Sequence, residues 1–437
     1  MNAPIRVGLL GLGTVGCGVW ETLLTNRDEI ANRAGHHIEI RRIAVRDVAR
    51  ARAIVGDRVP VGDDPFAVVA ADDVDVVAEL IGGTGIAREL VLAAVARGKH
   101  VVTANKALLA VHGNEVFDAA SRHQVMIAFE AAVAGGIPII KAMREGLTAN
   151  RIEWFAGIIN GTTNFILSEM RDKGLAFDAV LREAQRLGYA EADPTFDIEG
   201  IDAAHKATLL ASIAFGVPVQ FDRAYVEGIS ALAEEDIRYA EKLGYRIKLL
   251  GIGRRRSDGI ELRVHPTLIP ARRLLANVEG AMNAVWVKGD VVGHTMYYGK
   301  GAGKEPTASA VVADLVDVAR MISADPVNRV PHLAFQPDRM TDSPILPRGR
   351  IRTAYYLRMQ VADEPGVLAD ITRILADGTV SIDAMLQRES ADGEGSTDII
   401  ILTHVTDEHR IDTAIERIES LATVLSRVIR LRVESLD

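Results

Sequence analysis

The stretch VGLLGLGTVGCGVW (residues 7–20) decides the fold of the first part of the chain. It places Gly11, Gly13 and Gly16 in G-x-G-x-x-G spacing, directly after an apolar run typical of a buried strand and at the start of a helical pattern. Glycine at these positions permits a tight turn and lets the backbone approach a pyrophosphate, whose charge meets the helix N-terminus. The stretch predicts a dinucleotide-binding βαβ unit; the alternative is a glycine turn that only packs a helix on a strand.

Around this stretch, short Val/Ile/Leu runs alternate with helical patterns up to about residue 140. Examples are IEIRRIAV (38–45) and HVVTA (100–104). Runs that are apolar throughout, rather than alternating, are typical of strands buried on both faces of a sheet. The pattern predicts an α/β fold that begins with a Rossmann-type, doubly wound parallel sheet.

The later parts of the chain follow other patterns. Longer helical segments mixed with strand-like runs predict an α+β region. Five prolines between residues 326 and 347 then predict an extended connection. The last part of the chain shows the order β, α, β, β, α, β, which is typical of a ferredoxin-like module. We expect four parts: a dinucleotide-binding domain at 1–140, an α+β domain at 141–320, a linker at 321–349, and a C-terminal module at 350–437.

Composition narrows the class of protein. The chain has 437 residues, of which 48% are hydrophobic and 25% charged, as in ordinary globular enzymes. One cysteine, Cys17, excludes an intramolecular disulfide and a cysteine-based metal cluster. The sequence has no run of about 18 apolar residues, and the N-terminus reaches its glycine turn too soon for a signal peptide. A net charge of −9 disfavours nucleic acid as a partner. We expect a cytoplasmic protein that neither crosses a membrane nor binds nucleic acid.

Residues at the carboxyl ends of the predicted strands should face the dinucleotide, because ligands of such sheets lie beyond these ends. After the second strand, Arg46 could pair a 2′-phosphate, and Asp47 could accept a hydrogen bond from an unphosphorylated ribose, so NADP and NAD both stay open, with a lean to NADP. In VVTANKALLA (101–110), Lys106 could donate to a substrate oxygen or a ribose hydroxyl. The alternative for Lys106 is a solvated lysine at a helix start.

The stretch FEAAVAGGIPII (129–140) combines one carboxylate, Glu130, with a glycine pair and a proline. Bent backbone of this kind exposes carbonyl oxygens, which could hold a hard monovalent cation beside the carboxylate. A plain hinge between two parts of the chain is the alternative.

Charged residues are concentrated in GYAEADPTFDIEGIDAAHK (188–206). If a helix begins near Gly200, Asp202 and Lys206 share one face at i and i+4, which in isolation is typical of a solvated surface pair. The preceding loop could bring Glu191 and Asp193 to the same place. Clustered carboxylates suit a substrate ammonium, and a lysine beside them suits proton transfer to or from an oxygen.

Taken in order, GLGTVG, ELIGG, TANKALLA, EAAVAGGIPII, NGTTNFIL, GYAEADPTFDIEGIDAAHK and GKGAGKEPTASAVVAD resemble the homoserine dehydrogenase family over nearly the whole chain, and the part after residue 350 resembles an ACT domain. The resemblance implies reversible oxidation of L-homoserine to L-aspartate 4-semialdehyde with NAD or NADP, by the dehydrogenase alone rather than by a fusion with aspartate kinase. The alternatives are another amino-acid dehydrogenase on this scaffold and a non-catalytic amino-acid sensor.

The resemblance also implies roles for individual residues. Lys206 would transfer the proton, with Lys106 beside the reacting oxygen, although which lysine carries the proton stays open. Glu191, Asp202 and Asp197 would hold the substrate, and Glu130, Val133, Gly135 and Ile137 would bind a sodium ion. The implied cofactor-binding residues are Gly11, Gly13, Thr14, Val15, Gly16, Ala44, Arg46, Thr103, Lys106 and Gly303.

The resemblance further implies that residues 141–320 bind the substrate and join the subunits of a homodimer or homotetramer. It also implies that a segment at about 300–345 returns to the dinucleotide-binding domain. In VADEPGVLADI (361–371), a bend at Pro365 and Gly366 precedes a helix whose free backbone N–H groups could cradle a carboxylate. ACT domains commonly bind amino-acid effectors at this loop, and the pathway from homoserine leads to threonine. We therefore expect L-threonine to inhibit through residues 363–368; the alternative is a module that only dimerises.

Overall fold

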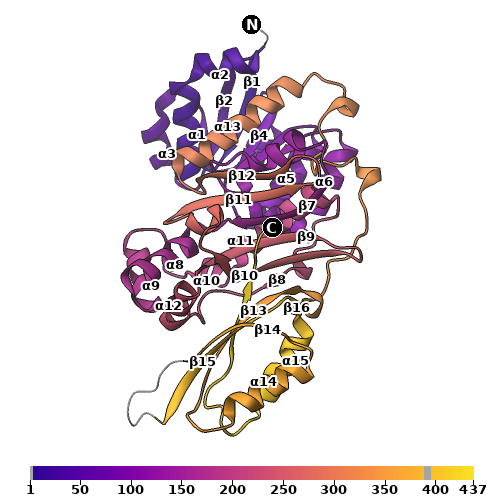
Figure 1. The fold of residues 1–437 in the computed structure, drawn as a ribbon. Helices are drawn as coiled ribbons and strands as arrows, with labels where there is room; N and C mark the ends of the chain where they lie inside the picture. The colour runs from indigo at the N-terminus through magenta and orange to yellow at the C-terminus, as the bar shows by residue number, and fades with distance from the viewer. Residues whose placement is uncertain (1–2, 388–394) are drawn as a thin grey trace.

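Two sheets organise the computed structural model, which describes residues 3–387 and 395–437. The first sheet is parallel and has six strands in the order β3-β2-β1-β4-β5-β6, which confirms the expected doubly wound fold (Figure 1). Its strands are β1 (Ile5–Leu10), β2 (Ile38–Ala44), β3 (Val61–Gly62), β4 (Val76–Glu79), β5 (His100–Thr103) and β6 (Ile127–Ala128).

Helices cover both faces of the first sheet. In β4, Val76 and Ala78 pack into one core with α1, while Val77 packs into another with α5. The chain later returns to this sheet, because α13 (Lys304–Met321) packs against α1 and α2. The other helices of this part are α1 (Thr14–Thr25), α2 (Arg27–Ala34), α3 (Val48–Val55), α4 (Pro65–Ala70), α5 (Ile86–Ala96) and α6 (Lys106–Arg122).

The second sheet is mixed and has eleven strands. Nine follow the order β12-β11-β7-β9-β10-β17-β13-β15-β14, while β16 pairs with β13 and β8 with β10. The strands are β7 (Ile152–Ile158), β8 (Tyr225–Val226), β9 (Tyr245–Arg255), β10 (Ile260–Pro270), β11 (Met282–Gly289), β12 (Gly293–Lys300), β13 (Arg352–Ala362), β14 (Ile382–Gln387), β15 (Ser396–Thr403), β16 (Thr406–Asp407) and β17 (Ile429–Val433).

Alternation along the central strands separates two cores, as the period of two in a strand requires. On one face, Leu249 and Val285 pack toward α11 (Ile201–Phe215); on the other, Leu250 and Trp286 pack with the segment η5 (Leu274–Asn277). The remaining helices of this half are α7 (Ile139–Lys141), α8 (Gly161–Lys173), α9 (Phe177–Arg186), α10 (Thr195–Ile198) and α12 (Glu234–Lys242).

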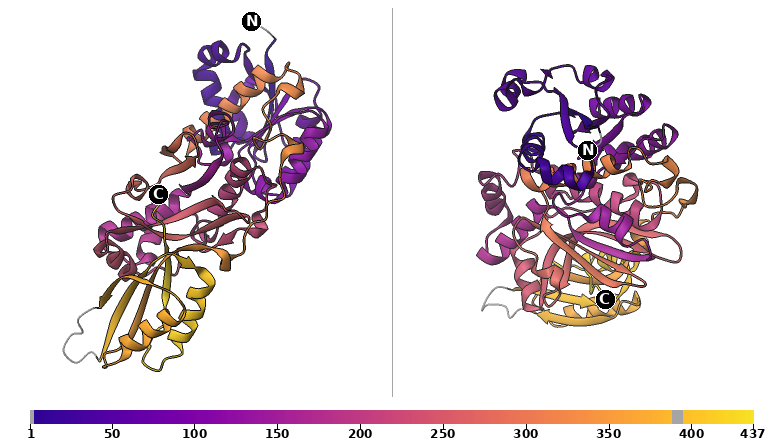
Figure 2. Two further views of the ribbon diagram at one scale, coloured as in Figure 1. Left: turned by 45° about the vertical axis from the view of Figure 1, so that its right-hand side comes forward. Right: turned by 90° about the horizontal axis from the view of Figure 1, so that it is seen from above.

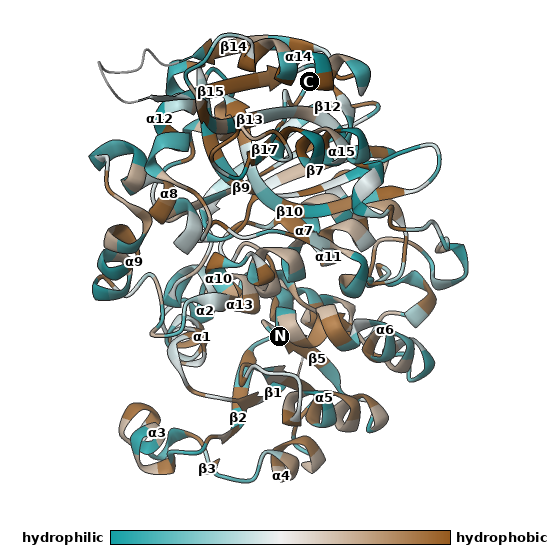
Figure 3. Ribbon diagram, turned by 90° about the horizontal axis from the view of Figure 1, so that it is seen from below, coloured by the Kyte–Doolittle hydropathy of each residue, from teal (hydrophilic) through white to brown (hydrophobic). Residues whose placement is uncertain are grey.

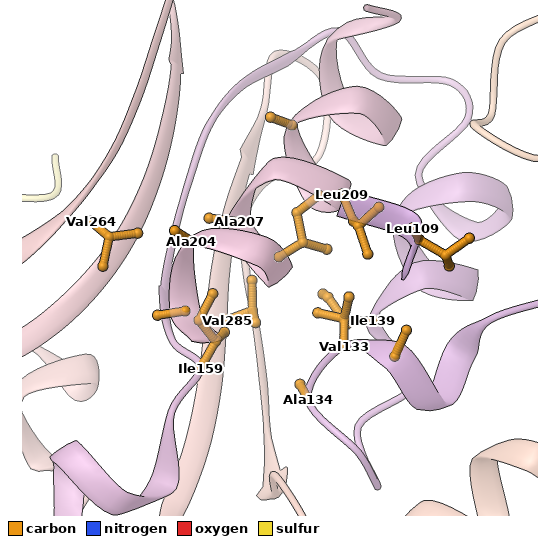
Figure 4. Close-up of a cluster of buried hydrophobic side chains, with 14 of the residues drawn as sticks. Leu109, Val133, Ala134, Ile139, Ile159, Ala204, Ala207, Leu209, Val264 and Val285 are labelled. Carbon is orange, nitrogen blue, oxygen red and sulfur yellow. The ribbon is translucent and has the colours of Figure 1, made fainter. Parts of the chain in front are cut away.

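Helix α11 is buried along almost its whole length, from Asp202 to Phe215. Figure 4 shows it between Val264 and Val285 of the second sheet on one side and Leu109 and Ile139 on the other. A helix that is apolar on all sides suits such a position between two layers. It therefore carries its charged residues into the junction between the two halves of the molecule.

The C-terminal module contains α14 (Val367–Asp377) and α15 (Glu408–Glu419), so its elements follow the expected β, α, β, β, α, β order, with the short β16 added. In Figure 3 its helices are striped in teal and brown, as amphipathic helices are. The module forms one end of an elongated molecule (Figure 2), but the chain terminus returns to the middle (Figure 1).

The last strand joins the module to the rest of the second sheet. In β17, Arg432 and Val433 lie opposite Thr267 and Leu268 of β10 in parallel register. Next to this pairing, buried Arg263 Nη2 lies 2.5 Å from buried Glu434 Oε1. The sequence did not indicate that the C-terminal strand would complete a sheet begun by the middle of the chain. Among the described residues, no helix has the length and apolar character needed to cross a membrane.

Candidate active site

The glycine turn after β1 has the geometry of a pyrophosphate cradle. Gly11 has φ 98°, and a side chain on Gly16 would place its Cβ 2.3 Å from the Gly11 carbonyl oxygen, so neither position admits another residue without a shift. Helix α1 follows with Gly13 as its N-cap, without a side chain that caps its first N–H groups. These N–H groups and the positive end of α1 fit an anion.

A cavity of about 420 Å³ lies beside this turn and is lined by four of the predicted cofactor residues, Gly11, Gly13, Ala44 and Arg46. The predicted Thr14, Val15 and Gly16 form the first turn of α1. Asp47 also lines the cavity, but one of its carboxylate oxygens accepts a hydrogen bond from Arg50 N (2.9 Å) as the cap of α3. Arg50 lines the cavity as well, so two guanidinium-bearing residues stand where the sequence indicated one.

The ends of β4 and β5 are held together by a carboxylate that the sequence did not indicate. Glu79 Oε1 accepts hydrogen bonds from Ile81 N and Gly82 N, each at 2.9 Å, and Glu79 Oε2 accepts one from Thr103 Oγ1 at 2.6 Å. Glu79 and the predicted cofactor residue Thr103 are completely buried. Thr103 therefore fixes the end of β5 just before Lys106. Gly303, with φ 126°, is the N-cap of α13.

Two lysines from different parts of the fold meet at one carboxylate. Lys106 begins α6 after β5, whereas Asp202 and Lys206 lie one turn apart on α11. Lys206 Nζ donates to Asp202 Oδ2 (2.6 Å) and to the Ile159 carbonyl oxygen (2.8 Å), and Lys106 Nζ lies 2.9 Å from Asp202 Oδ1. Because Asp202 and Lys206 are only 3% and 8% exposed, they are not the solvated surface pair that the spacing alone would suggest.

This arrangement sets the charges of the three groups. Burial opposes ionisation of Asp202, but the ammonium groups of Lys206 and Lys106 outweigh it and hold the pKa of this carboxyl well below its ordinary value. Burial lowers the pKa of Lys206 despite the attraction of Asp202. For Lys106, the carboxylates of Asp202, Asp197 and Glu191 outweigh burial and raise the pKa. Of the two lysines, Lys206 is therefore the one whose pKa moves toward that of a base.

The predicted substrate residues lie around this cluster in different ways. Asp197 is joined to Asp202 by Asn160, whose Nδ2 lies 2.7 Å from Asp197 Oδ1 and 2.8 Å from Asp202 Oδ2. Burial raises the pKa of Asp197, and the charge of Asp202 adds to the effect. Glu191 lies on an exposed part of the loop, from which its charge acts on Lys106. The sequence thus indicated the carboxylates but not the amide between two of them.

An aromatic side chain lies over the cluster. The ring of Phe196 on α10 lies 6.0 Å from Lys106 Nζ, and it packs against the imidazole of His205. Phe221 packs on the same imidazole, with ring centroids 4.3 Å apart. Burial lowers the pKa of His205 to about 4, so this imidazole is neutral at pH 7. The aromatic packing makes His205 a wall of the site rather than a charged member of it.

The predicted cation loop contains a second buried carboxylate. Glu130 accepts hydrogen bonds from Ile140 N (2.9 Å) and Lys141 N (2.8 Å), and its own N–H donates to Asp314 on α13 (2.8 Å). Burial raises the pKa of Glu130 to about 7, and burial with the charge of Glu130 raises that of Asp314 well above its ordinary value. The positive charges near these two carboxyls do not outweigh the effect of burial. Val133 and Ile137 are buried in the same loop, and Gly135 has φ 47°.

Among the described residues, no group of three or more His, Cys, Asp or Glu side chains is arranged to hold a metal ion. A cation at Glu130 would therefore depend on backbone carbonyls, as the sequence indicated. Asn160 was detectable as a helix cap, because Asn followed by Gly-Thr-Thr and an apolar run is a helix-start signal. Asp314 had no such signal, because it lies on a helix far along the chain from Glu130.

Comparison with known proteins gives three family matches along the chain. The family model for the NAD-binding domain of homoserine dehydrogenase matches residues 11–130, the one for homoserine dehydrogenase matches residues 138–316, and the one for the ACT domain matches residues 355–423. Together they reach from the glycine turn to the C-terminal module. The ACT match confirms the expected nature of that module.

Relatives match over the full length. The chain is 60% identical over 434 residues to homoserine dehydrogenase of Pseudomonas aeruginosa, covering 99% of this chain and 100% of the relative, and 58% identical to that of Neisseria gonorrhoeae, covering 99% of each. A crystal structure of a homoserine dehydrogenase from Thiobacillus denitrificans is 66% identical, covers 99% of both chains and has a TM-score of 0.95. The chain belongs to the homoserine dehydrogenase family of NAD(P)-dependent oxidoreductases that act on a CH–OH group.

Proposed function

We propose that the junction between the first sheet and α11, where Lys106, Asp202 and Lys206 meet, catalyses the reversible oxidation of L-homoserine to L-aspartate 4-semialdehyde. The observation that carries this proposal is the meeting of Lys106, from the end of a dinucleotide-binding strand, with Asp202 and Lys206 of α11. The two ammonium groups suit a substrate oxygen, and the carboxylate between them suits a substrate amine. Lys106 follows β5, whose carboxyl end faces the proposed cofactor side of the sheet. When bound, the nicotinamide supplies the site that takes or gives the hydride.

The chain supplies orientation and proton transfer. The carboxylates of Glu191, Asp197 and Asp202 bind the substrate ammonium, which fixes the carbon that carries the hydroxyl. Lys106 donates a hydrogen bond to the substrate oxygen. Lys206 takes the hydroxyl proton during oxidation and returns it during reduction, which its lowered pKa favours.

For the cofactor, we propose NADP in preference to NAD. Arg46 and Arg50 line the cavity at the end of β2, while Asp47 is already engaged as the cap of α3. A 2′-phosphate is well matched by two guanidinium groups, which is the observation that favours NADP. A solved hyperthermophilic archaeal homoserine dehydrogenase, 25% identical over 74% of this chain with a TM-score of 0.63, is a complex with NADPH.

We also propose a sodium ion at Glu130, with carbonyl oxygens of Val133, Gly135 and Ile137. The donor set fits a hard monovalent cation, because it consists of oxygens that carry little total charge. The raised pKa values of Glu130 and Asp314 support the proposal, since a nearby cation would stabilise both ionised carboxyls. Its role would be to hold the bend between the two halves of the site.

The chain should assemble as a homodimer or homotetramer. Apolar side chains are exposed at the edge of the second sheet, where the turn after β11 exposes Val291 and Val292 at 76% and 47% and β12 exposes Tyr298 at 59%. Apolar surface of this kind is typical of interfaces between subunits. Sedimentation at micromolar concentration tests the assembly, and a monomer there would refute it. The single cysteine fits the cytoplasmic location that we propose.

Turnover tests the activity directly. We expect absorbance changes at the reduced-nicotinamide band with homoserine and NADP, smaller ones with NAD, and none with aspartate. Oxidation of another amino acid in place of homoserine would assign the chain a different substrate. Lys206→Ala serves as the matched inactive protein, because it keeps the dinucleotide cavity.

A further inference from the structure

The side chain of Asn160 links the start of α8 to two carboxylates of the proposed site. It lies between the end of β7 and the start of α8, is 4% exposed, and has all of its side-chain polar atoms engaged. The amide oxygen accepts hydrogen bonds from Thr163 N (2.8 Å) and Thr163 Oγ1 (3.0 Å). Because both donors lie on α8, the orientation of the amide is fixed, and its NH₂ group must point away from the helix.

The NH₂ group points at two carboxylates. Its nitrogen lies 2.7 Å from Asp197 Oδ1 and 2.8 Å from Asp202 Oδ2, so each N–H has one acidic acceptor. Two adjacent carboxylates repel, and without a donor between them they tend to share one proton. Asn160 supplies that donor and adds no charge. The positive end of α8 acts in the same direction.

Other charged groups also face this pair. Lys106 and Lys206 both act on Asp202 and Asp197. The nearby imidazole of His205 is neutral at pH 7, because burial lowers its pKa. The charge of Glu191 acts on Lys106. The lysines contact Asp202 directly, whereas the Asp197 carboxylate accepts a hydrogen bond from Asn160 Nδ2. Asp197 therefore depends on the amide more than Asp202 does.

We propose that Asn160 is a positioning residue of the reaction, whose amide holds Asp197 and Asp202 side by side as two carboxylates that receive the substrate ammonium. The inference rests on the proposed function and names a part of the site that holds no substrate itself. An isolated helix cap would need the amide oxygen alone. Here the nitrogen fixes the spacing and the ionisation of the acidic pair.

Two substitutions separate this role from capping. Asn160→Ser and Asn160→Asp both keep a side-chain oxygen able to cap α8, and both lose the two N–H donors. The acid-side apparent pKa of kcat/KM for homoserine should rise by about one pH unit in Asn160→Ser, since loss of a charge-assisted hydrogen bond is of that size. It should rise further in Asn160→Asp, which adds a third carboxylate.

Asn164→Ser is the matched control. Asn164 is a buried asparagine one turn further along α8, and its amide hydrogen-bonds to Val278 O, Met282 O and Lys248 Nζ, away from the acidic pair. Its substitution should lower the melting temperature and leave the acid-side apparent pKa of kcat/KM for homoserine (the acid limb of the pH profile) unchanged. An unmoved acid limb in both Asn160 variants, in protein that turns over homoserine, would overturn the proposal.

A third variant keeps the test decisive if the Asn160 variants do not fold. Asp197→Asn removes the like charge beside Asp202 and leaves Asn160 intact, so the acid limb should move to lower pH. An acid limb that stays in place would show that the two carboxyls do not titrate as a pair, and the proposal would fail. Wild-type protein without homoserine turnover would instead refute the proposed function.

Discussion

Lys106 Nζ and Asp202 Oδ1 lie 2.9 Å apart although one residue follows a strand of the first sheet and the other belongs to a helix packed on the second. The contact spans the junction between the part of the molecule that binds the dinucleotide and the part that carries the acidic loop. Its geometry depends on how the two sheets are placed. Any change in that placement would alter the distance between the cofactor crevice and the substrate carboxylates.

Replacing Lys206 should affect the chemical step. Lys206→Ala is expected to lower kcat by roughly a hundredfold or more, the size of a lost general acid–base contribution, with a smaller change in dinucleotide affinity. Lys173→Ala is the matched control, because Lys173 forms an (i,i+4) pair with Glu169 on the surface of α8. Near wild-type kcat in Lys206→Ala would remove Lys206 from proton transfer.

Neutralising Glu191 should affect the substrate and not the cofactor. Glu191→Gln keeps the shape of the side chain and loses its charge, so the KM for homoserine should rise by about tenfold, while the KM for NADP changes much less. Steady-state kinetics with each substrate varied in turn measures both. Glu183→Gln, on the exposed face of α9, controls for a general loss of acidic surface charge. Equal increases of the two constants would assign Glu191 a structural role.

The sequence indicated the parts of this site better than their connections. Gly11, Gly13 and Gly16 follow a local rule, and Asp202 and Lys206 lie on one helix, so spacing alone brought each set together. The contacts of Glu79 with Thr103 and of Asn160 with Asp197 depend on how separate elements pack, which no local pattern encodes. For the same reason, the C-terminal module was indicated by the order of its elements, whereas the pairing of β17 with β10 was not.

Cofactor preference should depend on Arg46. Arg46→Ala is expected to reduce the ratio of kcat/KM for NADP to that for NAD by about tenfold or more, through loss of a charge-assisted contact with the 2′-phosphate. Arg52→Ala is the matched control, because Arg52 lies on α3 but is not among the residues that line the cavity. Kinetics with both cofactors gives the ratio. An unchanged ratio would leave Arg50 as the residue to replace next.

Stability should depend on pH and sodium through Glu130. The pKa of this carboxyl rises from 4.5 to about 7 on folding, so the folded protein binds more protons in that window. The free energy of unfolding should therefore fall as the pH rises from 4.5 through 7, by roughly 3 kcal/mol above pH 7 for an isolated group. Sodium bound to the ionised carboxylate would offset this loss.

Thermal unfolding at pH 8 in sodium chloride and in tetramethylammonium chloride of equal ionic strength measures the effect of sodium. The melting temperature should be higher in sodium, and the difference should disappear in Glu130→Gln. A wild-type protein with the same melting temperature in both salts would argue against the cation and favour a plain hinge at this bend.

Threonine inhibition should be tested by point variants rather than by removal of the C-terminal module. A chain ending at Arg348 would lose Glu434 and leave the fully buried Arg263 without this partner, and it would also lose Arg358, which donates to buried Asp236 at 2.6 Å. Breaking such buried pairs destabilises a protein strongly, so loss of activity would reflect unfolding.

Asp363→Asn changes one charge where the loop meets α14, beside Gly366, the N-cap of that helix with φ 98°. If threonine binds there through its ammonium and carboxylate, the concentration for half inhibition should rise by about tenfold or more. Asp377→Asn, at the other end of α14, is the control. Because coupling between two sites is reciprocal, homoserine should also weaken the binding of threonine measured by calorimetry. Unchanged inhibition in Asp363→Asn, or threonine binding that homoserine does not affect, would leave the module with a role in assembly alone.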